Sequence, residues 1–345
     1  MQIEQSPLFS IVICNHDRKQ YIRNAVDSAL AQDFPKDLFE IIVVKNYYDE
    51  EIDDYLVKHN ILSVFTDDAF LPQKMVRGVR NSKGRYICFL DDDDLIAAGK
   101  LKRIATFIEK HGEISFYHDS FFIINEMGKV NRKIQSNATP SIQELDGPDE
   151  IMKNMPYLLR HKIDWYASMM CINKEILKDK ASILESAIAS ADRLLFLIGI
   201  SNGGVVILDN ERNTYYRLHQ SLTTKFLPFA EFMKSRENFY NNSLYSFKAS
   251  YNLFANNYAF IVLDMFVAHE SIMATFTGSV EQCTLVNVFK KTVKYSFRFR
   301  RKNLFIWYVM LFLKKIFKTT VVKLYYVLTT SGLKKNVSLN PKHVI

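Results

Sequence analysis

The sequence is short of the features that mark several classes of protein. Its 345 residues include only four cysteines, which are far apart: Cys14, Cys88, Cys171 and Cys283. Two of them lie in apolar, strand-like runs, where cysteine behaves as a small hydrophobic residue. We therefore expect reduced thiols in a cytosolic compartment rather than a disulfide framework. No basic segment followed by an apolar one opens the chain, so we also expect no secretory signal.

Long apolar runs are lacking as well. The two most apolar stretches, Tyr258 to Ala268 and Leu304 to Leu313, fall short of the roughly 20 residues that cross a bilayer. Internal repeats and low-complexity tracts are absent. A hydrophobic content of 48% is nevertheless enough for a large core, which excludes a disordered or fibrous chain. We expect one catalytic domain with an appendage.

Acidic residues are missing from the end of the chain. None follows Glu281, whereas that segment holds 14 lysines and arginines. Such a tail predicts an anionic partner, either phospholipid or nucleic acid. Aromatic residues around the apolar run 304–313 favour an anionic membrane surface, and no known binding motif supports nucleic acid. The alternative is a helical subdomain that packs on the catalytic domain with its bases in water.

One acidic stretch is the strongest local signal. Tyr86 to Leu90 is a short apolar and aromatic run that follows a Lys83-Gly84 turn and ends in four carboxylates, residues 91–94. It predicts a buried strand that delivers charge to one edge of a sheet. Adjacent carboxylates repel one another, and their hard oxygen atoms select Mg2+ or Mn2+. The alternative is a solvated acidic loop.

Strands and helices are expected to alternate around this stretch. The predicted strands cover residues 9–14, 40–44, 62–65 and 86–90, and the predicted helices cover 20–32, 52–59, 74–82 and 100–110. This alternation predicts a parallel sheet between helices, with ligands at the carboxyl ends of the strands. Beyond it we expect strands at 114–117 and 121–124, a polar loop at 130–150, an apolar return at 165–172, a helix at 188–200 and a strand at 205–208.

Four stretches together resemble the family 2 glycosyltransferases of the GT-A fold. They are residues 10–18, residues 82–94, Ala191-Asp192, and residues 216–219 with 221–223. The resemblance implies a GT-A catalytic domain over residues 1–225, with a Rossmann-like mixed sheet flanked by helices. Residues 226–345 would form a helical, basic extension, associated with the membrane interface or with the acceptor.

The resemblance also implies an activity. The enzyme would move a sugar, with inversion, from a UDP- or GDP-sugar to a hydroxyl of a glycan or lipid-linked acceptor, at the cytoplasmic face of the cell membrane. Asp93 would ligate Mn2+ or Mg2+, which stabilises the departing diphosphate as a Lewis acid. Asp192 would be the general base, although an isolated Asp at that place is also a favourable helix N-terminal acid.

The family's pattern can be carried over to further residues of this sequence. Contacts with the nucleotide sugar are expected from Cys14, Asn15, Asp17, Arg18, Asn46, Lys74, Asp91, Asp92 and Arg217, and the metal ligands would be Asp91, Asp93 and His219. A lone histidine is more often a packed or surface residue. Asp94 either assists at the metal or caps the helix at 100–110.

The sequence departs from the family's pattern in two places. Relatives carry an Asp pair after the second strand, but this chain has Lys45-Asn46 there. The Asn46 amide could still bind a base edge, and Asp67 or Asp68 could substitute. The usual acid before the catalytic Asp is replaced by Ala191. Two other hypotheses stay open: a nucleotidyltransferase or phosphatase, which would not need Asp192, and a non-catalytic module that binds sugar nucleotides at a membrane.

Overall fold

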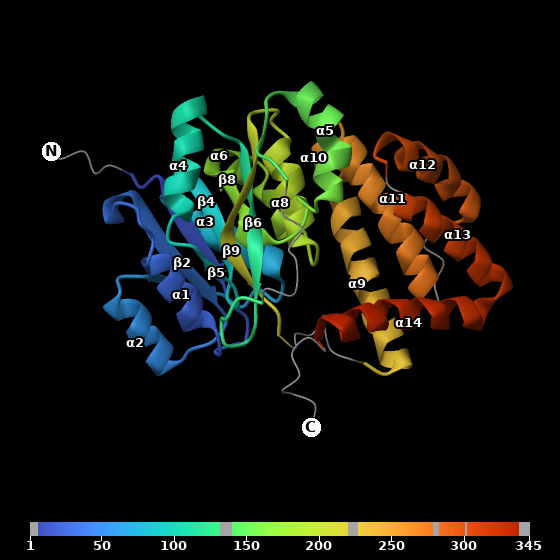
Figure 1. The fold of residues 1–345 in the computed structure, drawn as a ribbon, viewed down its shortest axis with the longest axis horizontal. Helices are drawn as coiled ribbons and strands as arrows, with labels where there is room; N and C mark the ends of the chain where they lie inside the picture. The colour runs from blue at the N-terminus through green and yellow to red at the C-terminus, as the bar shows by residue number, and fades with distance from the viewer. Residues whose placement is uncertain (1–5, 132–139, 220–226, 279–282, 301, 338–345) are drawn as a thin grey trace. The chain divides into compact units, whose positions relative to one another are not determined.

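The computed structural model describes residues 6–131, 140–219, 227–278, 283–300 and 302–337 (Figure 1). The chain forms two compact units. The first comprises residues up to Asn131, Gln135–Leu218 and Asn252–Ala259, and the second comprises Arg132–Ile134, His219–Tyr251 and Phe260–Ile345. The domain boundary predicted at 225 lies outside the described residues.

The first unit is built on a mixed nine-stranded sheet. Its order is β3-β2-β1-β4-β8-β6-β9-β5, and β7 pairs with β9. The strands are β1 (Phe9–Cys14), β2 (Phe39–Lys45), β3 (Leu62–Phe65), β4 (Tyr86–Asp91), β5 (Leu95–Ile96), β6 (Phe116–Ile124), β7 (Gln143–Leu145), β8 (Met170–Asn173) and β9 (Val206–Arg217). The first four strands are parallel, and β8 pairs antiparallel to β4 and to β6. This mixed sheet confirms the predicted fold class.

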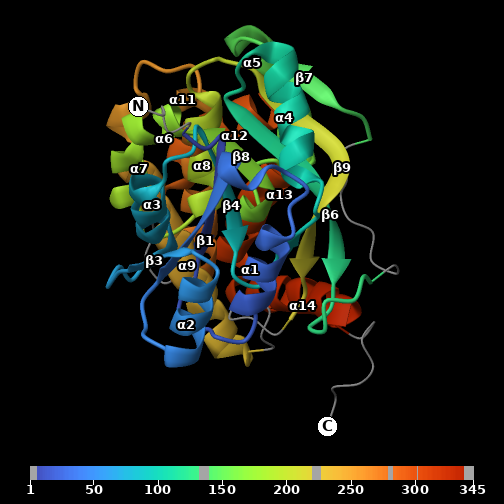
Figure 2. The same ribbon diagram turned by 90° about the vertical axis from the view of Figure 1, so that its left-hand side faces the viewer.

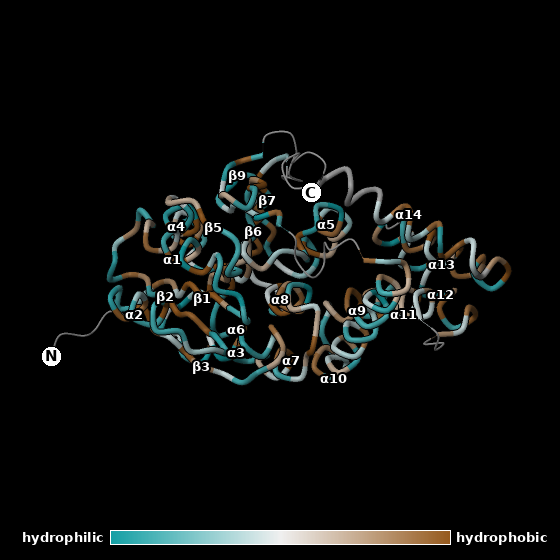
Figure 3. Tube along the Cα trace, turned by 90° about the horizontal axis from the view of Figure 1, so that it is seen from below, coloured by the Kyte–Doolittle hydropathy of each residue, from teal (hydrophilic) through white to brown (hydrophobic). Residues whose placement is uncertain are grey.

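Helices cover both faces of the sheet (Figures 2 and 3). The helices of this unit are α1 (Ile22–Leu30), α2 (Glu50–Lys58), α3 (Leu71–Asn81), α4 (Lys100–His111), α5 (Pro148–Arg160), α6 (Lys174–Asp179), α7 (Ala181–Glu185), α8 (Ala191–Ile200) and α10 (Tyr251–Phe254), with short 3-10 turns η1 (Lys36–Leu38) and η2 (Ala167–Met169). Alternate β1 residues Phe9, Ile11 and Ile13 share one core cluster with apolar residues of α1, α2 and α4. The pleat turns Val12 to the opposite face, where it meets Gly78 of α3.

The turn before β4 depends on close backbone approach. The N–H of Gly84 donates to Ser10 Oγ at 2.8 Å, and a Cβ at residue 84 would lie 2.4 Å from the backbone nitrogen of Ser10. Only glycine fits this position, because the neighbouring backbone cannot move aside. The turn therefore sets where β4, and the acidic stretch after it, enters the sheet.

Several expected boundaries were wrong. The two strands expected at 114–117 and 121–124 are the single strand β6, and β9 runs unbroken to Arg217 rather than ending at 208. The loop expected at 130–150 includes β7 and the start of α5, which has Pro148 in its first turn. The expected return at 165–172 begins as η2 before it becomes β8, and the helix expected from 188 begins at Ala191.

The second unit is helical. It contains α9 (Phe229–Ala249), α11 (Phe260–Thr277), α12 (Leu285–Arg298), α13 (Lys302–Ile316) and α14 (Lys318–Val337). Asp264 on α11 joins two of these helices, because its carboxylate accepts hydrogen bonds from Lys291 at 2.6 Å and from Tyr295, both on α12. By length and composition α11 could cross a membrane, but 83% of it is buried inside the protein, as in a core helix. The apolar run 304–313 lies within α13.

Candidate active site

The acidic stretch forms a carboxylate cluster at the carboxyl end of β4. Asp91, Asp93 and Asp94 offer oxygen atoms that all lie within 4.8 Å of one another. Burial, together with the charges of Asp94 and Asp93, raises the pKa of Asp91 well above its ordinary value. Burial likewise raises the pKa of Asp94 to about 7. Three convergent carboxyl groups of this kind fit a hard divalent cation, which would offset their mutual repulsion.

Asp94 is held by two neighbours that the sequence did not single out for this purpose. Its Oδ2 accepts a hydrogen bond from Ser168 Oγ at 2.7 Å, and its Oδ1 accepts one from the backbone N–H of Arg217 at 2.8 Å. The same Ser168 hydroxyl accepts from the backbone N–H of Asp91 at 3.0 Å. The suggestion that Asp94 caps the next helix was wrong, since the N-cap of α4 is Gly99.

Asp92 is bound by residues that follow β1. It is 3% exposed and accepts hydrogen bonds from the Asn15 amide and from the Arg18 guanidinium. Arg18 also forms an ion pair with Asp93 at 2.7 Å. The structure thus brings together three of the residues predicted to contact the nucleotide sugar, at the ends of the adjacent strands β1 and β4.

Asp17, which follows β1, and Asn46, which follows β2, are hydrogen-bonded to each other. The Asn46 amide donates to Asp17 Oδ1 at 2.9 Å, and its oxygen accepts from the backbone N–H of Asp17 at 3.1 Å. Lys45 is buried and turns to Asp53 on α2, at 2.8 Å. The amide proposed to read a base edge is therefore paired with Asp17 in this structure.

Lys74 and Cys14 are buried close to this edge. Lys74, on α3, donates to the carbonyl of Asn15 at 3.2 Å and contacts His16 Nδ1 at 2.5 Å. Burial lowers the pKa of its amino group. Burial also raises the pKa of the Cys14 thiol, so this thiol is unreactive and is not a nucleophile. Both residues lie where nucleotide contacts were predicted, and those roles stay predictions.

The proposed base is the second residue of α8. Asp192 Oδ2 accepts a hydrogen bond from the backbone N–H of Tyr166 at 3.0 Å. Burial raises the pKa of its carboxyl group, and its charge acts in turn on Asp91. A carboxylate in such surroundings is a stronger base than one in water. Its backbone partner was not predicted, because no local pattern links residues 26 positions apart.

Arg217 bonds to backbone carbonyls in this structure, and its contact with the nucleotide sugar stays a prediction. Its guanidinium donates to the carbonyls of Asp93 at 2.6 Å, Asn125 at 3.1 Å and Glu126 at 2.8 Å, and it lies 4.5 Å from the ring centroid of Tyr21. The side chain therefore supports the loop after β4 in this structure. His219 lies two residues farther on, in the second unit, and its role as a metal ligand stays a prediction.

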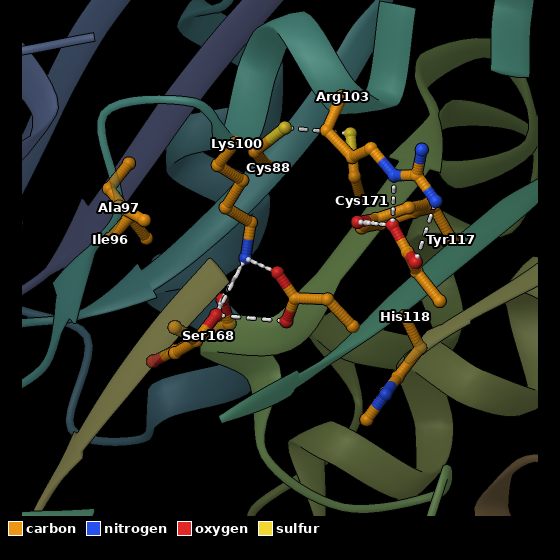
Figure 4. Close-up of polar contacts among 12 residues, drawn as sticks. Cys88, Ile96, Ala97, Lys100, Arg103, Tyr117, His118, Ser168 and Cys171 are labelled. Atoms are coloured by element: carbon orange, nitrogen blue, oxygen red, sulfur yellow. Dashed lines mark hydrogen bonds and ion pairs between the residues drawn. The ribbon is translucent and has the colours of Figure 1, made fainter. Parts of the chain in front are cut away.

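A buried ion pair between Lys100 and Asp119 lies next to Ser168 (Figure 4). Lys100 Nζ lies 3.0 Å from Asp119 Oδ2 and donates to the Ser168 carbonyl and to Thr214 Oγ1, each at 2.8 Å. The Lys100 and Asp119 side chains are 1% and 0% exposed. Because Ser168 contacts both Lys100 and Asp94, this pair positions one of the groups that hold the carboxylates. A lysine at the start of a helix gave no sequence signal for such a role.

The comparison with known families identifies the first unit. Residues 10–175 match the sequence model of Glycosyl transferase family 2. The chain carries a family 2 glycosyltransferase domain. This domain holds the Asp91–Asp94 stretch, while Asp192 and Arg217 lie beyond the matched residues.

Several curated proteins are similar to parts of this chain. Poly(ribitol-phosphate) beta-N-acetylglucosaminyltransferase TarS of Staphylococcus aureus is 27% identical over 132 residues, which is 36% of this chain and 22% of TarS. Minor teichoic acid biosynthesis protein GgaB of Bacillus subtilis is 23% identical over 246 residues, which is 69% of this chain and 26% of GgaB. The chain therefore matches only about a quarter of the length of these relatives.

Solved structures confirm the fold. The crystal structure of S. aureus TarS 1-349 has a TM-score of 0.52 and 18% identity, and the match covers 89% of this chain and 80% of that one. The TarS 1-349 complex with UDP-GlcNAc has a TM-score of 0.51 and 15% identity, and covers 89% of this chain and 91% of that one. The GT-A glycosyltransferase architecture expected from the sequence is thus found in the structure.

Proposed function

We propose that the chain is an inverting glycosyltransferase. It transfers a sugar from a nucleotide-diphosphate donor to a hydroxyl of a glycan, a polyol-phosphate polymer or a lipid-linked acceptor. One observation carries the proposal: residues 166–168 contact the proposed base and the carboxylate cluster together. Tyr166 holds Asp192, and Ser168 holds Asp91 and Asp94. The base and the leaving-group side of the reaction are therefore parts of one site.

The reaction follows from these positions. Asp192 takes the proton of the acceptor hydroxyl, whose oxygen forms a bond to the anomeric carbon of the donor. The bond from that carbon to the diphosphate breaks on the opposite side, and its electron pair leaves with the nucleoside diphosphate. A single displacement of this kind inverts the anomeric configuration.

A divalent cation fits the carboxylate cluster. Asp91 and Asp93, with Asp94 close by, would hold Mn2+ or Mg2+, which would supply Lewis-acid stabilisation of the leaving diphosphate. Arg18 already pairs with Asp92 and Asp93, so it fixes the loop in which the ligands lie.

The test of this function is product analysis with defined substrates. Structures of TarS are known with UDP-GlcNAc and with UDP, so UDP-GlcNAc is the first donor and poly(ribitol phosphate) the first acceptor. We expect release of nucleoside diphosphate and an inverted linkage by NMR, lost in Asp93→Ala and on chelation but kept in the exposed control Asp54→Ala. Release of pyrophosphate or phosphate, or of nothing from any UDP- or GDP-sugar, would contradict the proposal.

We also propose that the second unit attaches to an anionic membrane surface on the cytoplasmic side. On α13, Leu304 and Leu311 are buried, but Ile306, Phe312 and Ile316 are 52%, 49% and 58% exposed. Lys314 and Lys315 lie on the same helix, and no acidic residue follows Glu281. Exposed apolar side chains among bases are typical of helices that lie in the headgroup region. Such a place would give the enzyme access to a lipid-linked acceptor.

A further inference from the structure

Three aromatic rings from separate segments lie together in the first unit. We call Phe121 of β6, Tyr166 before η2 and Tyr216 of β9 the aromatic cluster. The ring centroids of Tyr166 and Tyr216 are 5.0 Å apart, and each lies within 5.7 Å of the Phe121 ring. Phe121 is 8% exposed, whereas both tyrosines are only half-buried. The tyrosines therefore form the open side of the aromatic cluster.

Backbone hydrogen bonds connect the aromatic cluster both to the proposed base and to the carboxylate cluster. Tyr166 itself donates its N–H to Asp192 at 3.0 Å. Arg217, which follows Tyr216, donates its N–H to Asp94 at 2.8 Å. Burial raises the pKa of the Tyr166 hydroxyl, and the charges of Asp192 and Asp94 raise it further. The two rings thus lie close to the proposed base and to the carboxylate cluster.

The hydroxyl groups of these tyrosines lack a hydrogen-bond partner within the part of the chain that the structure describes. Among the described residues, neither the Tyr166 nor the Tyr216 hydroxyl forms a hydrogen bond. A fully buried tyrosine hydroxyl normally finds such a partner inside the protein. Tyr117 on β6 shows the ordinary case, because its hydroxyl donates to Asp209 at 3.0 Å. The hydroxyls of the cluster are left available to a ligand.

The backbone of Tyr166 is also unusual. Its φ of 67° and ψ of 85° place it in the left-handed region, which a bulky residue seldom adopts. The conformation is held by the bond from its N–H to Asp192 and by the bond from Met169 N–H to its carbonyl at 3.0 Å. Strained residues of this kind gather at functional sites, where the surrounding structure maintains them.

We propose that Tyr166 and Tyr216 form the acceptor subsite, and that it takes a polyhydroxylated unit, either a sugar ring or a sugar alcohol. Such a unit has C–H groups that pack on an aromatic ring and hydroxyls that bond to a phenol. Tyr166 is assigned to the acceptor rather than to the donor because its own N–H holds the base that takes the acceptor proton. The inference rests on the glycosyltransferase function proposed above and names residues for its acceptor side.

The test compares Tyr166→Phe, Tyr166→Leu and Tyr216→Phe with the wild type, using poly(ribitol phosphate) and UDP-GlcNAc. Loss of one hydroxyl bond should raise the acceptor KM about 2- to 10-fold, and Tyr166→Leu should raise it more. UDP affinity by calorimetry should stay within 2-fold of wild type, which shows that the variants fold and still bind the donor side. The control Tyr117→Phe loses a buried bond and should lower the melting temperature without changing the acceptor KM.

A binding measurement separates failure of the inference from failure of the function. Saturation-transfer NMR of a ribitol phosphate fragment needs no turnover, and its signal should fall in Tyr166→Leu. An unchanged signal, or an unchanged acceptor KM in Tyr166→Leu with wild-type transfer intact, would overturn the acceptor subsite. Absence of transfer by the wild type with normal, Tyr166-dependent fragment binding would instead contradict the proposed reaction and leave the subsite standing.

Discussion

Ser168 donates a hydrogen bond from its hydroxyl to Asp94 Oδ2 at 2.7 Å, and this bond links η2 to the carboxylate cluster. The same oxygen accepts the N–H of Asp91, so a single side chain aligns two of the proposed ligands. Groups that orient the ligands of a metal matter nearly as much as the ligands themselves.

Ser168→Ala should weaken Mn2+ binding, because the Asp94 carboxylate loses a hydrogen-bond donor and the backbone N–H of Asp91 loses its acceptor. Outer partners of ligands typically contribute about 10- to 100-fold in metal affinity. Titration of the protein with Mn2+, followed by electron paramagnetic resonance, measures this directly. Ser120→Ala is the matched control, since Ser120 is a buried serine of β6 that donates to Asp209. Equal Mn2+ affinity in the wild type and Ser168→Ala would show that Ser168 only packs.

Asp192→Asn should lower transfer while leaving donor binding nearly intact. Loss of a positioned general base typically reduces the rate about 100- to 10,000-fold. The amide keeps an oxygen that can accept the Tyr166 N–H, so the local fold should survive. Initial rates and UDP calorimetry check the two halves of the prediction. Turnover within a few-fold of the wild type would mean that Asp192 serves only as a helix N-terminal acid.

Lys100→Met should destabilise the first unit strongly. The substitution leaves the fully buried Asp119 without its cation, and breaking one side of such a pair costs about 3–5 kcal/mol. The double variant Lys100→Met with Asp119→Leu removes both charges and should recover much of the loss. Urea unfolding measures all three proteins. A single variant as stable as the wild type would show that the pair adds nothing.

His118 should make the protein sensitive to acid. Burial lowers the pKa of its imidazole to about 4, and the charge of Lys100 acts in the same direction. Between pH 6.5 and about 4 the unfolded chain therefore binds a proton at His118 that the folded chain does not bind. The stabilisation is full above pH 6.5 and is lost as the pH falls to about 4. The free energy of unfolding falls by about 3 kcal/mol over this range. His118→Gln should flatten this part of the pH–stability curve in chemical unfolding. A curve as steep as that of the wild type would assign the acid sensitivity to other groups.

Exposed apolar residues of α13 should decide membrane binding. The wild type should float with anionic liposomes, partly released by high salt, because each nearby base contributes about 1 kcal/mol at an anionic surface. The double variant Ile306→Ser with Phe312→Ser should float much less, while Tyr245→Ser, an exposed residue of α9, should behave as the wild type. A wild type that stays unbound at low salt, or that self-associates through this face instead, would contradict the membrane proposal.

The sequence predicted those parts of the fold whose signals are local. Tyr86 to Leu90 follows a turn that only Gly84 allows and is apolar throughout, and Asp91 comes directly after it, so the sequence predicts both the strand and its acidic end. β6 was split in the prediction because the polar residues 118–120 interrupt its apolar pattern. In the structure these residues are buried, since Lys100 and Thr214 satisfy Asp119. Lys100 and Thr214 lie 19 and 95 residues away from Asp119 in the sequence, so the hydropathy pattern of the strand gives no sign of them.

In the site, too, the sequence predicted only the residues that carry a local signal. Asp91, Asp93 and Asp192 carry motif signals, whereas Tyr166 and Ser168 act through a backbone N–H and a hydroxyl whose partners come from other strands and helices. The sequence does not predict α5, because a Gly-Pro pair such as Gly147-Pro148 is typical of a loop. The same pair begins a helix here, with Gly147 at a φ of 83° and Pro148 in the first turn.

The short turn at residues 166–168 has a consequence for the timing of the reaction. Because it contacts Asp192 at one end and Asp94 at the other, the spacing of base and leaving-group site is set when the chain folds. The entropy of aligning the two groups is then lost during folding and not again in each catalytic cycle. Such an enzyme depends on the accurate seating of its two substrates more than on movement of its own catalytic groups.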